Sequence, residues 1–301
     1  MPVSASLTLS MVSSCHALIG ILALICALLA GGESQAAAKV FQDKEIVFAK
    51  PLIIAGTGDS QALLRRVAER FERDHIKTGV RVEVPDGIGS GGGILSLKKG
   101  VAQLARTTRP LKKREHNGLL SIPFAVSPIV FAVHPSVTGI DDLTSEQILA
   151  IYSGKILNWS ELGGVDNKIY VVNREHGDSS MRVLDRTVAK GEINWQVGKV
   201  FFSTSRAAKA VAAHPFTIGY LPLSIAMGSG LKVLSINGVG PEESAVVSGK
   251  YPHILYFELV AKKPIDGWEK KFIKYLFSPK IRSFMLKIGV YPIVGGVPPG
   301  L

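Results

Sequence analysis

Residues 51–100 decide the fold, and they read PLIIAGTGDSQALLRRVAERFERDHIKTGVRVEVPDGIGSGGGILSLKKG. The apolar run at residues 52–55 predicts a buried strand, and residues 63–71 then place apolar side chains at helical spacing opposite a row of arginines. Residues 80–84 alternate like a second strand, and a glycine-rich loop at residues 86–93 leads into a short helix. The strand–loop–helix order occurs twice and predicts a parallel sheet with covering helices.

The rest of the chain continues this alternation without an internal repeat of fixed period. Thr144 and Gln147 form a capping box in front of one predicted helix. Further strands are predicted at residues 122–126, 129–133, 169–172, 218–221 and 255–260. Further helices are predicted at residues 145–152, 180–190, 268–277 and 280–288.

Length and composition indicate a globular protein with room for two domains. The chain has 301 residues, of which 47% are hydrophobic and 20% are charged, so disorder and a multi-span membrane protein are both disfavoured. A net charge of +11 is compatible with a protein that binds nucleic acid, an anionic surface or an anionic ligand. The main basic cluster, residues 112–114, has no interleaved aromatics and predicts a solvated helix start. We therefore expect small anions as partners and no nucleic acid.

The N-terminal segment predicts export. Residues 17–30 are apolar and uncharged but too short to span a bilayer, which takes about 20 apolar residues. A small-residue site at residues 36–38 predicts a signal peptide over residues 1–38, cut after Ala38, and a periplasmic protein. No Lys or Arg precedes the apolar run, so a retained membrane anchor is the alternative. Both cysteines, Cys15 and Cys26, lie in this segment, so the mature chain would hold no disulfide.

Three loops place glycine and hydroxyl residues where a strand is followed by a helix. They are residues 56–60 (GTGDS), 89–93 (GSGGG) and 176–180 (HGDSS). The first turn of a helix has free backbone N–H groups and a partial positive charge, glycine lets an anion approach, and a hydroxyl adds a donor. Ser, Gly and Asp are also ordinary helix caps, so one such loop says little. Three of them beside free arginines predict an oxyanion site.

Other kinds of site find little support. The second loop matches G-x-G-x-x-G at residues 87–92, but the acidic residue expected about 20 positions later is missing, which disfavours a nucleotide cofactor. The seven histidines show no metal-ligand spacing, and there is no G-x-S-x-G elbow. His176 is either a ligand contact or a solvated loop residue. We expect that the protein has no cofactor and no metal and that it is not an enzyme. The alternative is a secreted phosphatase-like enzyme.

Five motifs carry a family resemblance: residues 87–93, 107–111 (TTRPL), 151–159 (IYSGKILNW), 174–177 (REHG) and 218–220 (IGY). With them the chain resembles the phosphate-binding periplasmic proteins of ABC transporters, a branch of the type II periplasmic binding proteins, from about Ile53 to Val294. The resemblance implies a two-lobed α/β fold, each lobe a mixed, mainly parallel sheet flanked by helices, with two hinge strands. Lobe one would take residues 46–127 and 258–301, and lobe two residues 128–257.

The resemblance also implies a function and a set of ligand contacts. The protein would be the solute-binding component of an ABC-type uptake system, a monomer that binds inorganic phosphate between its lobes and delivers it to permease subunits. Alternatives are another oxyanion or small polar ligand, or a non-transport phosphate sensor. Arg174 would form a bidentate pair with the anion. The implied ligand-binding residues are Gly58, Ser60, Ser90, Gly91, Thr107, Thr108, Arg109, Arg174, Asp178, Ser179 and Ser180.

The third loop departs from the family, because Asp178-Ser179-Ser180 stands where relatives usually have Ser-Gly-Thr. Gln103 also replaces an acidic residue common in the family. As a helix cap, Asp178 would occupy the N–H groups that an anion needs and would repel the anion. Two unit charges about 4 Å apart interact by roughly 4 kcal/mol at a surface-like dielectric. Alternatively, Asp178 accepts a hydrogen bond from a protonated oxyanion.

Overall fold

The computed structural model describes residues 50–191, 195 and 197–293, all of them within the compact unit Phe48–Leu301. The predicted signal peptide, residues 1–38, and both ends of the predicted lobe one lie outside the described residues. Within the described part of the chain, no helix is both long and apolar enough to span a bilayer.

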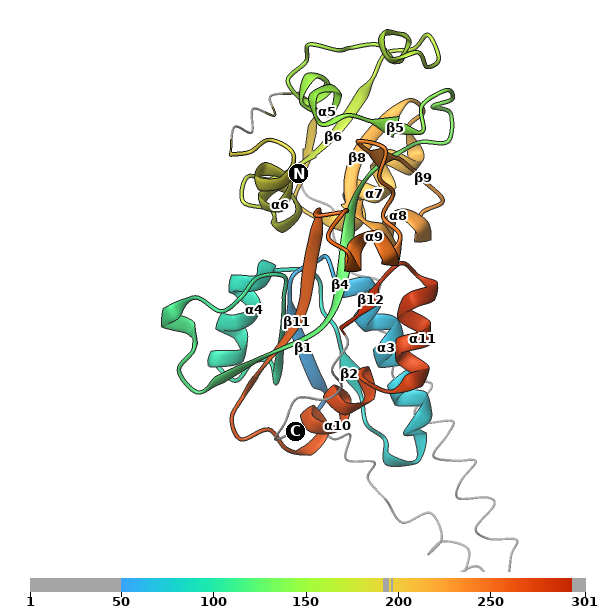
Figure 1. The fold of residues 1–301 in the computed structure, drawn as a ribbon. Coiled ribbons are helices and arrows are strands. Elements are labelled where there is room, and N and C mark those ends of the chain that lie inside the picture. Colours follow the sequence, from blue (N-terminus) through green and yellow to red (C-terminus); the bar gives the residue numbers. More distant parts are fainter. Residues whose placement is uncertain (1–49, 192–194, 196, 294–301) are drawn as a thin grey trace, which may run out of the picture. The chain divides into compact units, whose positions relative to one another are not determined.

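One mixed sheet runs through the molecule in the order β2-β1-β3-β11-β4-β8-β6-β7 (Figure 1). Strands β2, β1 and β3 pair in parallel, as do β8, β6 and β7, while β11 and β4 pair with their neighbours in antiparallel fashion. The predicted α/β fold with mainly parallel strands is therefore confirmed. The strands are β1 (Leu52–Gly56), β2 (Val82–Glu83), β3 (Leu104–Thr107), β4 (Leu119–Val133), β5 (Asp142–Leu143), β6 (Tyr170–Arg174), β7 (Lys199–Phe201), β8 (Thr217–Pro222), β9 (Lys232–Val233), β10 (Ser235–Ile236), β11 (Ile254–Lys262) and β12 (Tyr291–Pro292).

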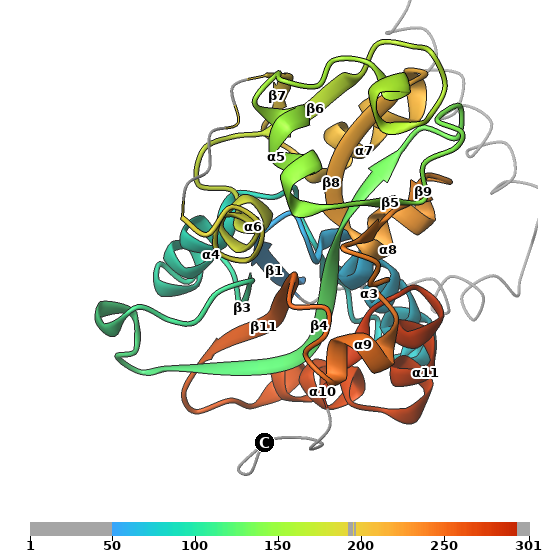
Figure 2. The ribbon, with the colours of Figure 1, turned by 45° about the horizontal axis from the view of Figure 1, so that its top comes forward.

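The two long strands, β4 and β11, connect the two parallel groups and lie side by side (Figure 2). Strand β4 pairs with β11 as far as Pro128 and with β8 from Ile129 onward. The prediction of two separate strands, residues 122–126 and 129–133, was wrong, because β4 is continuous over 15 residues. Pro128 cannot donate to a ladder, but it lies where β4 changes partner, so the strand tolerates it.

The helices cover the two parallel groups. Of the four helices predicted with bounds, three lie within two residues of them, α6 ends three residues earlier than predicted, and α7, α8 and α9 were not predicted. Helix α5 has the predicted bounds, and Thr144 and Gln147 form the predicted capping box. The helices are α3 (Gln61–Asp74), α4 (Gly89–Lys98), α5 (Ser145–Tyr152), α6 (Ser179–Thr187), α7 (Thr204–Ala213), α8 (Leu223–Gly228), α9 (Glu243–Val247), α10 (Gly267–Leu276) and α11 (Pro279–Lys287), with short 3-10 turns at Ile76–Thr78, Lys113–Glu115 and Trp159–Leu162.

The glycine-rich run was predicted as a loop, but residues 89–93 form the first turn of α4. The reason is packing rather than turn formation. A Cβ on Gly93 would lie 2.6 Å from the Cα of Gly56 and 2.7 Å from the carbonyl oxygen of Ala55, so only glycine lets α4 pack this closely on β1. This contact brings the N-terminus of α4 to the end of β1.

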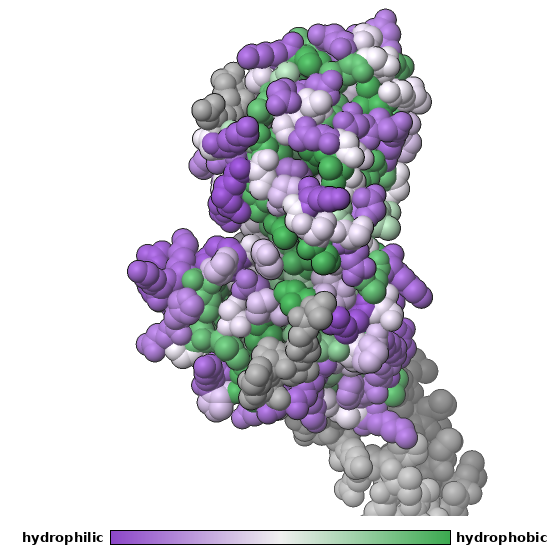
Figure 3. Space-filling model, in the orientation of Figure 1, coloured by the Kyte–Doolittle hydropathy of each residue, from purple (hydrophilic) through white to green (hydrophobic). Residues whose placement is uncertain are grey.

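Buried apolar side chains form a core on both sides of the long strands. Phe71 packs edge-on against Phe272 in one group, and Tyr152 and Tyr220 pack together with Phe131 in the other. Hydrophilic side chains, drawn in purple, cover much of the periphery of the face shown in Figure 3. Side chains of β1 and β6 are part of this core, and the loops that follow these strands line the candidate site.

Candidate ligand-binding cleft

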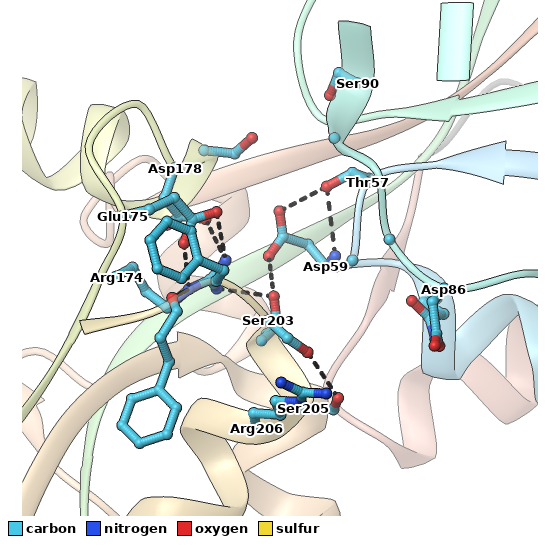
Figure 4. Close-up of a pocket in the computed structure, with 18 of the residues that line it drawn as sticks. Thr57, Asp59, Asp86, Ser90, Arg174, Glu175, Asp178, Ser203, Ser205 and Arg206 are labelled. Atoms are coloured by element: carbon cyan, nitrogen blue, oxygen red, sulfur yellow. Dashed lines mark hydrogen bonds and ion pairs between the residues drawn. The ribbon is translucent and has the colours of Figure 1, made fainter. Parts of the chain in front are cut away.

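A cavity of about 1030 Å³ lies at the carboxyl ends of β1 and β6, and residues of all three predicted loops line it. Ligands of open α/β sheets bind at this edge, because the loops and helix N-termini that follow parallel strands converge there. Figure 4 shows Thr57 and Asp59 on one wall, and Arg174, Glu175 and Asp178 on another. Residues 199–206, which no motif predicted, complete the lining.

Arg106 holds the first two loops in place. It is fully buried and donates hydrogen bonds to the carbonyl oxygens of Thr57 and Pro85, both at 2.7 Å, and to that of Ile54. Burial, together with the nearby Arg65, lowers the pKa of Arg106 to about 10. Sequence reasoning missed this residue, because its acceptors are backbone groups that leave no pattern in the sequence.

Three hydroxyl residues from separate segments meet beside the cavity. The Oγ of Ser90 accepts a hydrogen bond from the amide of Thr108 at 3.3 Å, and the Oγ1 of Thr108 donates to the Oγ of Ser179 at 2.8 Å. Ser90 lies in the first turn of α4, and Ser179 is the first residue of α6. The hydrogen bond between Thr108 and Ser179 therefore joins the two parallel groups of strands. Ser90 and Ser179 line the cavity, and Thr108 lies directly behind them.

Arg174, at the end of β6, is 6% exposed and lies in the cavity wall. Its Nη1 donates to the Oγ1 of Thr204 at 2.9 Å, and its Nη2 lies 3.1 Å from the Oδ2 of Asp178. Its Nε lies 3.1 Å from the carboxylate of Glu175. Burial opposes the charge of Arg174, but the carboxylates of Asp178, Asp59 and Glu175 outweigh this and raise its pKa. Arg174 is therefore a fixed cation that is already surrounded by acids.

Asp178 is the N-cap of α6 and is 7% exposed. Its Oδ1 accepts hydrogen bonds from the amides of Ser180 and Met181, both at 3.1 Å. Of the two readings of Asp178, the helix cap is the one that the structure contains. The predicted oxyanion site therefore lacks two free amides at this loop, because the protein's own carboxylate occupies them. Burial raises the pKa of Asp178 to about 7, and Asp59 adds to this while Arg174 opposes it.

Asp59 is the acid that sequence reasoning missed. It is 2% exposed, and its carboxylate accepts hydrogen bonds from Thr57 at 3.0 Å and from Thr204 at 3.2 Å. Burial raises the pKa of Asp59, and the charge of Arg174 opposes the rise. The signal was present in the sequence: the first loop, like the third, carries an aspartate among neutral donors.

The remaining predicted residues occupy different positions. Gly58 and Gly91 line the cavity, as does Arg109, but the guanidinium of Arg109 is engaged by Glu115 at 2.7 and 2.9 Å. This pairing with Arg109 lowers the pKa of Glu115 to about 2. Thr107 is buried and donates to the carbonyl oxygen of Arg109.

Ser60 and Ser180 are each 1% exposed and lie outside the cavity lining. Their hydroxyl oxygens have no hydrogen-bond partner among the described residues. His176 is exposed and is not part of the lining either. Within residues 50–191, 195 and 197–293, no group of His, Cys, Asp and Glu side chains is placed to hold a metal ion.

Two parallel sheet groups joined by two long strands, with a polar cavity at their carboxyl ends, define a solute-binding protein of the two-lobed periplasmic class. Residues 32–280 match the model of the PBP superfamily domain. The chain therefore belongs to the PBP superfamily and, within it, to the phosphate-binding periplasmic proteins of ABC transporters. The resemblance inferred from the motifs is confirmed.

Individual relatives agree with this assignment. The phosphate-binding protein PstS of Bacillus subtilis is 30% identical over 246 residues, which cover 80% of each chain. A structure of an ABC transporter substrate-binding protein from Clostridium perfringens, with bound phosphate, is 27% identical with a TM-score of 0.70 and covers 81% of this chain and 99% of its own. An ABC-type phosphate transport receptor from Vibrio cholerae is also 27% identical, with a TM-score of 0.58, and covers 80% of this chain and 99% of its own.

Proposed function

We propose that this protein is the solute-binding component of an ABC-type uptake system and that inorganic phosphate binds in its cleft. The observation that carries the proposal is that Ser90 and Ser179, which are linked through Thr108, line the same cavity as the buried Arg174, in a member of the phosphate-binding family. Hydroxyl donors and a buried arginine are the groups that hold a small oxyanion.

The proposed lobes are residues 46–127 with 258–301, and residues 128–257. The change of partner along β4 between Pro128 and Ile129 supports this division, because β4 pairs with β11 before it and with β8 of the other parallel group after it. The hydrogen bonds from Thr108 to Ser179 and from Thr204 to Asp59 would then cross the cleft. A ligand held by both lobes would favour the closed arrangement.

Each ligand contact has a proposed role. Arg174 would supply the charge, and Ser90, Thr108 and Ser179 would donate hydroxyls. Backbone amides would come from Gly58 and from Gly91, which lies in the first turn of α4, a helix whose N-terminus carries no side-chain cap. The buried hydroxyls of Ser60 and Ser180, which lack partners among the described residues, lie outside the cavity lining and would reach the ligand only if the loops that carry them shift. Thr107 and Arg109 would support these contacts from behind.

The proposed role is binding rather than catalysis. A signal peptide cut after Ala38 would export the chain to the periplasm, where it would act as a monomer and deliver phosphate to permease subunits. The family membership and the predicted signal support this localisation and these partners.

Isothermal titration of refolded, ligand-free protein with phosphate tests the proposal. We expect a saturable heat of binding at one site per chain. An absence of heat at micromolar protein and millimolar phosphate would reject phosphate as the ligand. A thermal-shift screen of sulfate and other oxyanions would then identify the alternative, and the two buried acids Asp59 and Asp178 favour anions that carry a proton over fully ionised ones.

A further inference from the structure

The carboxylate of Asp178 already sits where an anion would bind in the third loop. One oxygen accepts from the amides of Ser180 and Met181, and the other lies 3.1 Å from Nη2 of Arg174. Amides at a helix N-terminus and a guanidinium are the groups that hold a bound oxyanion. Asp178 therefore makes with its own protein the contacts that the third loop could offer a ligand.

The surroundings of Asp178 show that this arrangement is electrostatically crowded. Asp59 faces it from the loop after β1, and Glu175 lies beside Arg174 at the end of β6. Among the described residues, Arg174 is the buried cation that these three acids share. Tyr220 on β8 also feels the charge of Asp178, and Arg182 on α6 is turned to the oxygens of Gly177 and Ser179.

An oxyanion added to this corner would meet three carboxylates around one guanidinium. Like charges about 4 Å apart repel by roughly 4 kcal/mol at a surface-like dielectric, so the anion and the ionised Asp178 exclude each other. The corner nevertheless keeps an unused donor, since the hydroxyl of Ser180 is buried without an acceptor while its amide donates to Asp178. A buried hydroxyl of this kind indicates that an acceptor is missing.

We propose that Asp178 is an internal competitor that sets the affinity and the specificity of the cleft: phosphate enters the third corner only when the Asp178 carboxylate leaves the α6 amides and Arg174 or gains a proton. This inference rests on the proposed function. Its consequence is a site whose affinity for phosphate is held down by the protein itself and falls as Asp178 ionises. The high pKa of Asp178 places this ionisation near neutral pH.

Replacement of Asp178 by a neutral cap tests the inference. In Asp178→Asn the amide oxygen still caps α6, since Asn and Asp are comparable N-caps, but the competing charge is gone. Isothermal titration with inorganic phosphate above neutral pH should show binding about tenfold to a hundredfold tighter than in the wild type. This difference should shrink as pH falls below about 7, where Asp178 of the wild type gains its proton.

Two controls separate competition from a general change of charge. Asp141→Asn removes a carboxylate that is 87% exposed and paired with Lys232, and it should leave the affinity within about twofold. Glu175→Gln removes a charge beside Arg174 that does not occupy the α6 amides. It should tighten binding less than Asp178→Asn does. Asp178→Ser serves as a second variant, because Ser is also a good cap.

The outcomes distinguish the inference from the function on which it rests. Thermal denaturation first checks that Asp178→Asn and Asp178→Ser are folded. If the wild type binds phosphate and neither folded variant binds it more tightly above neutral pH, the proposal that Asp178 competes with phosphate is overturned and the phosphate-binding function stands. Equal tightening by Glu175→Gln would assign the effect to net charge and would also overturn it. If neither the wild type nor any variant binds phosphate at any pH, both the proposed function and the proposal about Asp178 fail.

Discussion

Two buried arginines, Arg106 in β3 and Arg174 at the end of β6, have opposite kinds of partner. Arg106 is 0% exposed, and its partners among the described residues are backbone carbonyl oxygens, those of Ile54, Thr57 and Pro85. Arg174 is 6% exposed and lies among carboxylates at the edge of a cavity. Burial therefore lowers the pKa of Arg106 to about 10, whereas the surrounding acids raise that of Arg174.

The difference distinguishes a residue that holds the loops of the site in place, Arg106, from a residue that is available to bind the ligand, Arg174. Neutral carbonyl acceptors cannot be exchanged for a ligand, because they belong to the backbone of the loops that Arg106 holds. The acids around Arg174 are side chains that can rotate or take up a proton, so its guanidinium remains exchangeable. A buried cation paired with movable acids is thus a better candidate for ligand binding than one bonded to the main chain.

The largest expected effect is the loss of phosphate binding in Arg174→Met. Removal of one partner of a buried, charge-assisted pair costs about 3–5 kcal/mol, so the affinity should fall by about a thousandfold. Isothermal titration with phosphate measures it. An affinity that changes less than about tenfold would show that the anion does not contact Arg174, and the contrast between the two arginines would break down.

Arg106→Met should act on stability instead. Three carbonyl oxygens would lose their donor at a cost of about 1–3 kcal/mol each, partly offset because a desolvated guanidinium is removed, so the free energy of unfolding should fall by about 2–4 kcal/mol. Urea denaturation measures this value. A loss below about 1 kcal/mol would contradict the assignment of a structural role to Arg106.

The stability of the protein should decrease as pH rises toward neutrality. Asp178 has an ordinary pKa of 3.8 when unfolded and a pKa of about 7 when folded, so the folded state binds its proton more tightly. Its contribution is therefore fully present below 3.8 and is lost as pH rises through about 7, and Asp59 shifts in the same direction. Urea denaturation across this range, compared between the wild type and Asp178→Asn, isolates the slope. A difference between the two proteins that does not vary with pH would contradict this.

Thr204→Val should give the smallest effect. The Thr204 hydroxyl donates to Asp59 and accepts from Arg174, and valine keeps its shape. Loss of these hydrogen bonds should lower the free energy of unfolding by about 1–2 kcal/mol. The matched control is Ser248→Ala, which removes an exposed hydroxyl that does not line the cavity. It should change the free energy of unfolding by less than about 0.5 kcal/mol.

Much of the fold and part of the site could be predicted from local patterns. The start of α5 followed from its capping box, and the three glycine-and-hydroxyl loops do line a common cavity. The prediction failed where a distant segment decides the outcome. Pro128 did not break β4, because the strand changes partner there, and the glycines of residues 89–93 were needed for packing on β1 rather than for a loop.

The sequence by itself determined the alternation of strands and helices in the segments with clear periodicity, the family and the three corners, because periodicity, capping and turn chemistry act over a few neighbouring residues. Only the tertiary structure decided that Asp59 and Asp178 share one guanidinium, that Arg106 binds the main chain, and that Thr204 reaches across to the first loop. These contacts join segments far apart in the chain. Their energies depend on distance and burial, which no local pattern of residues specifies.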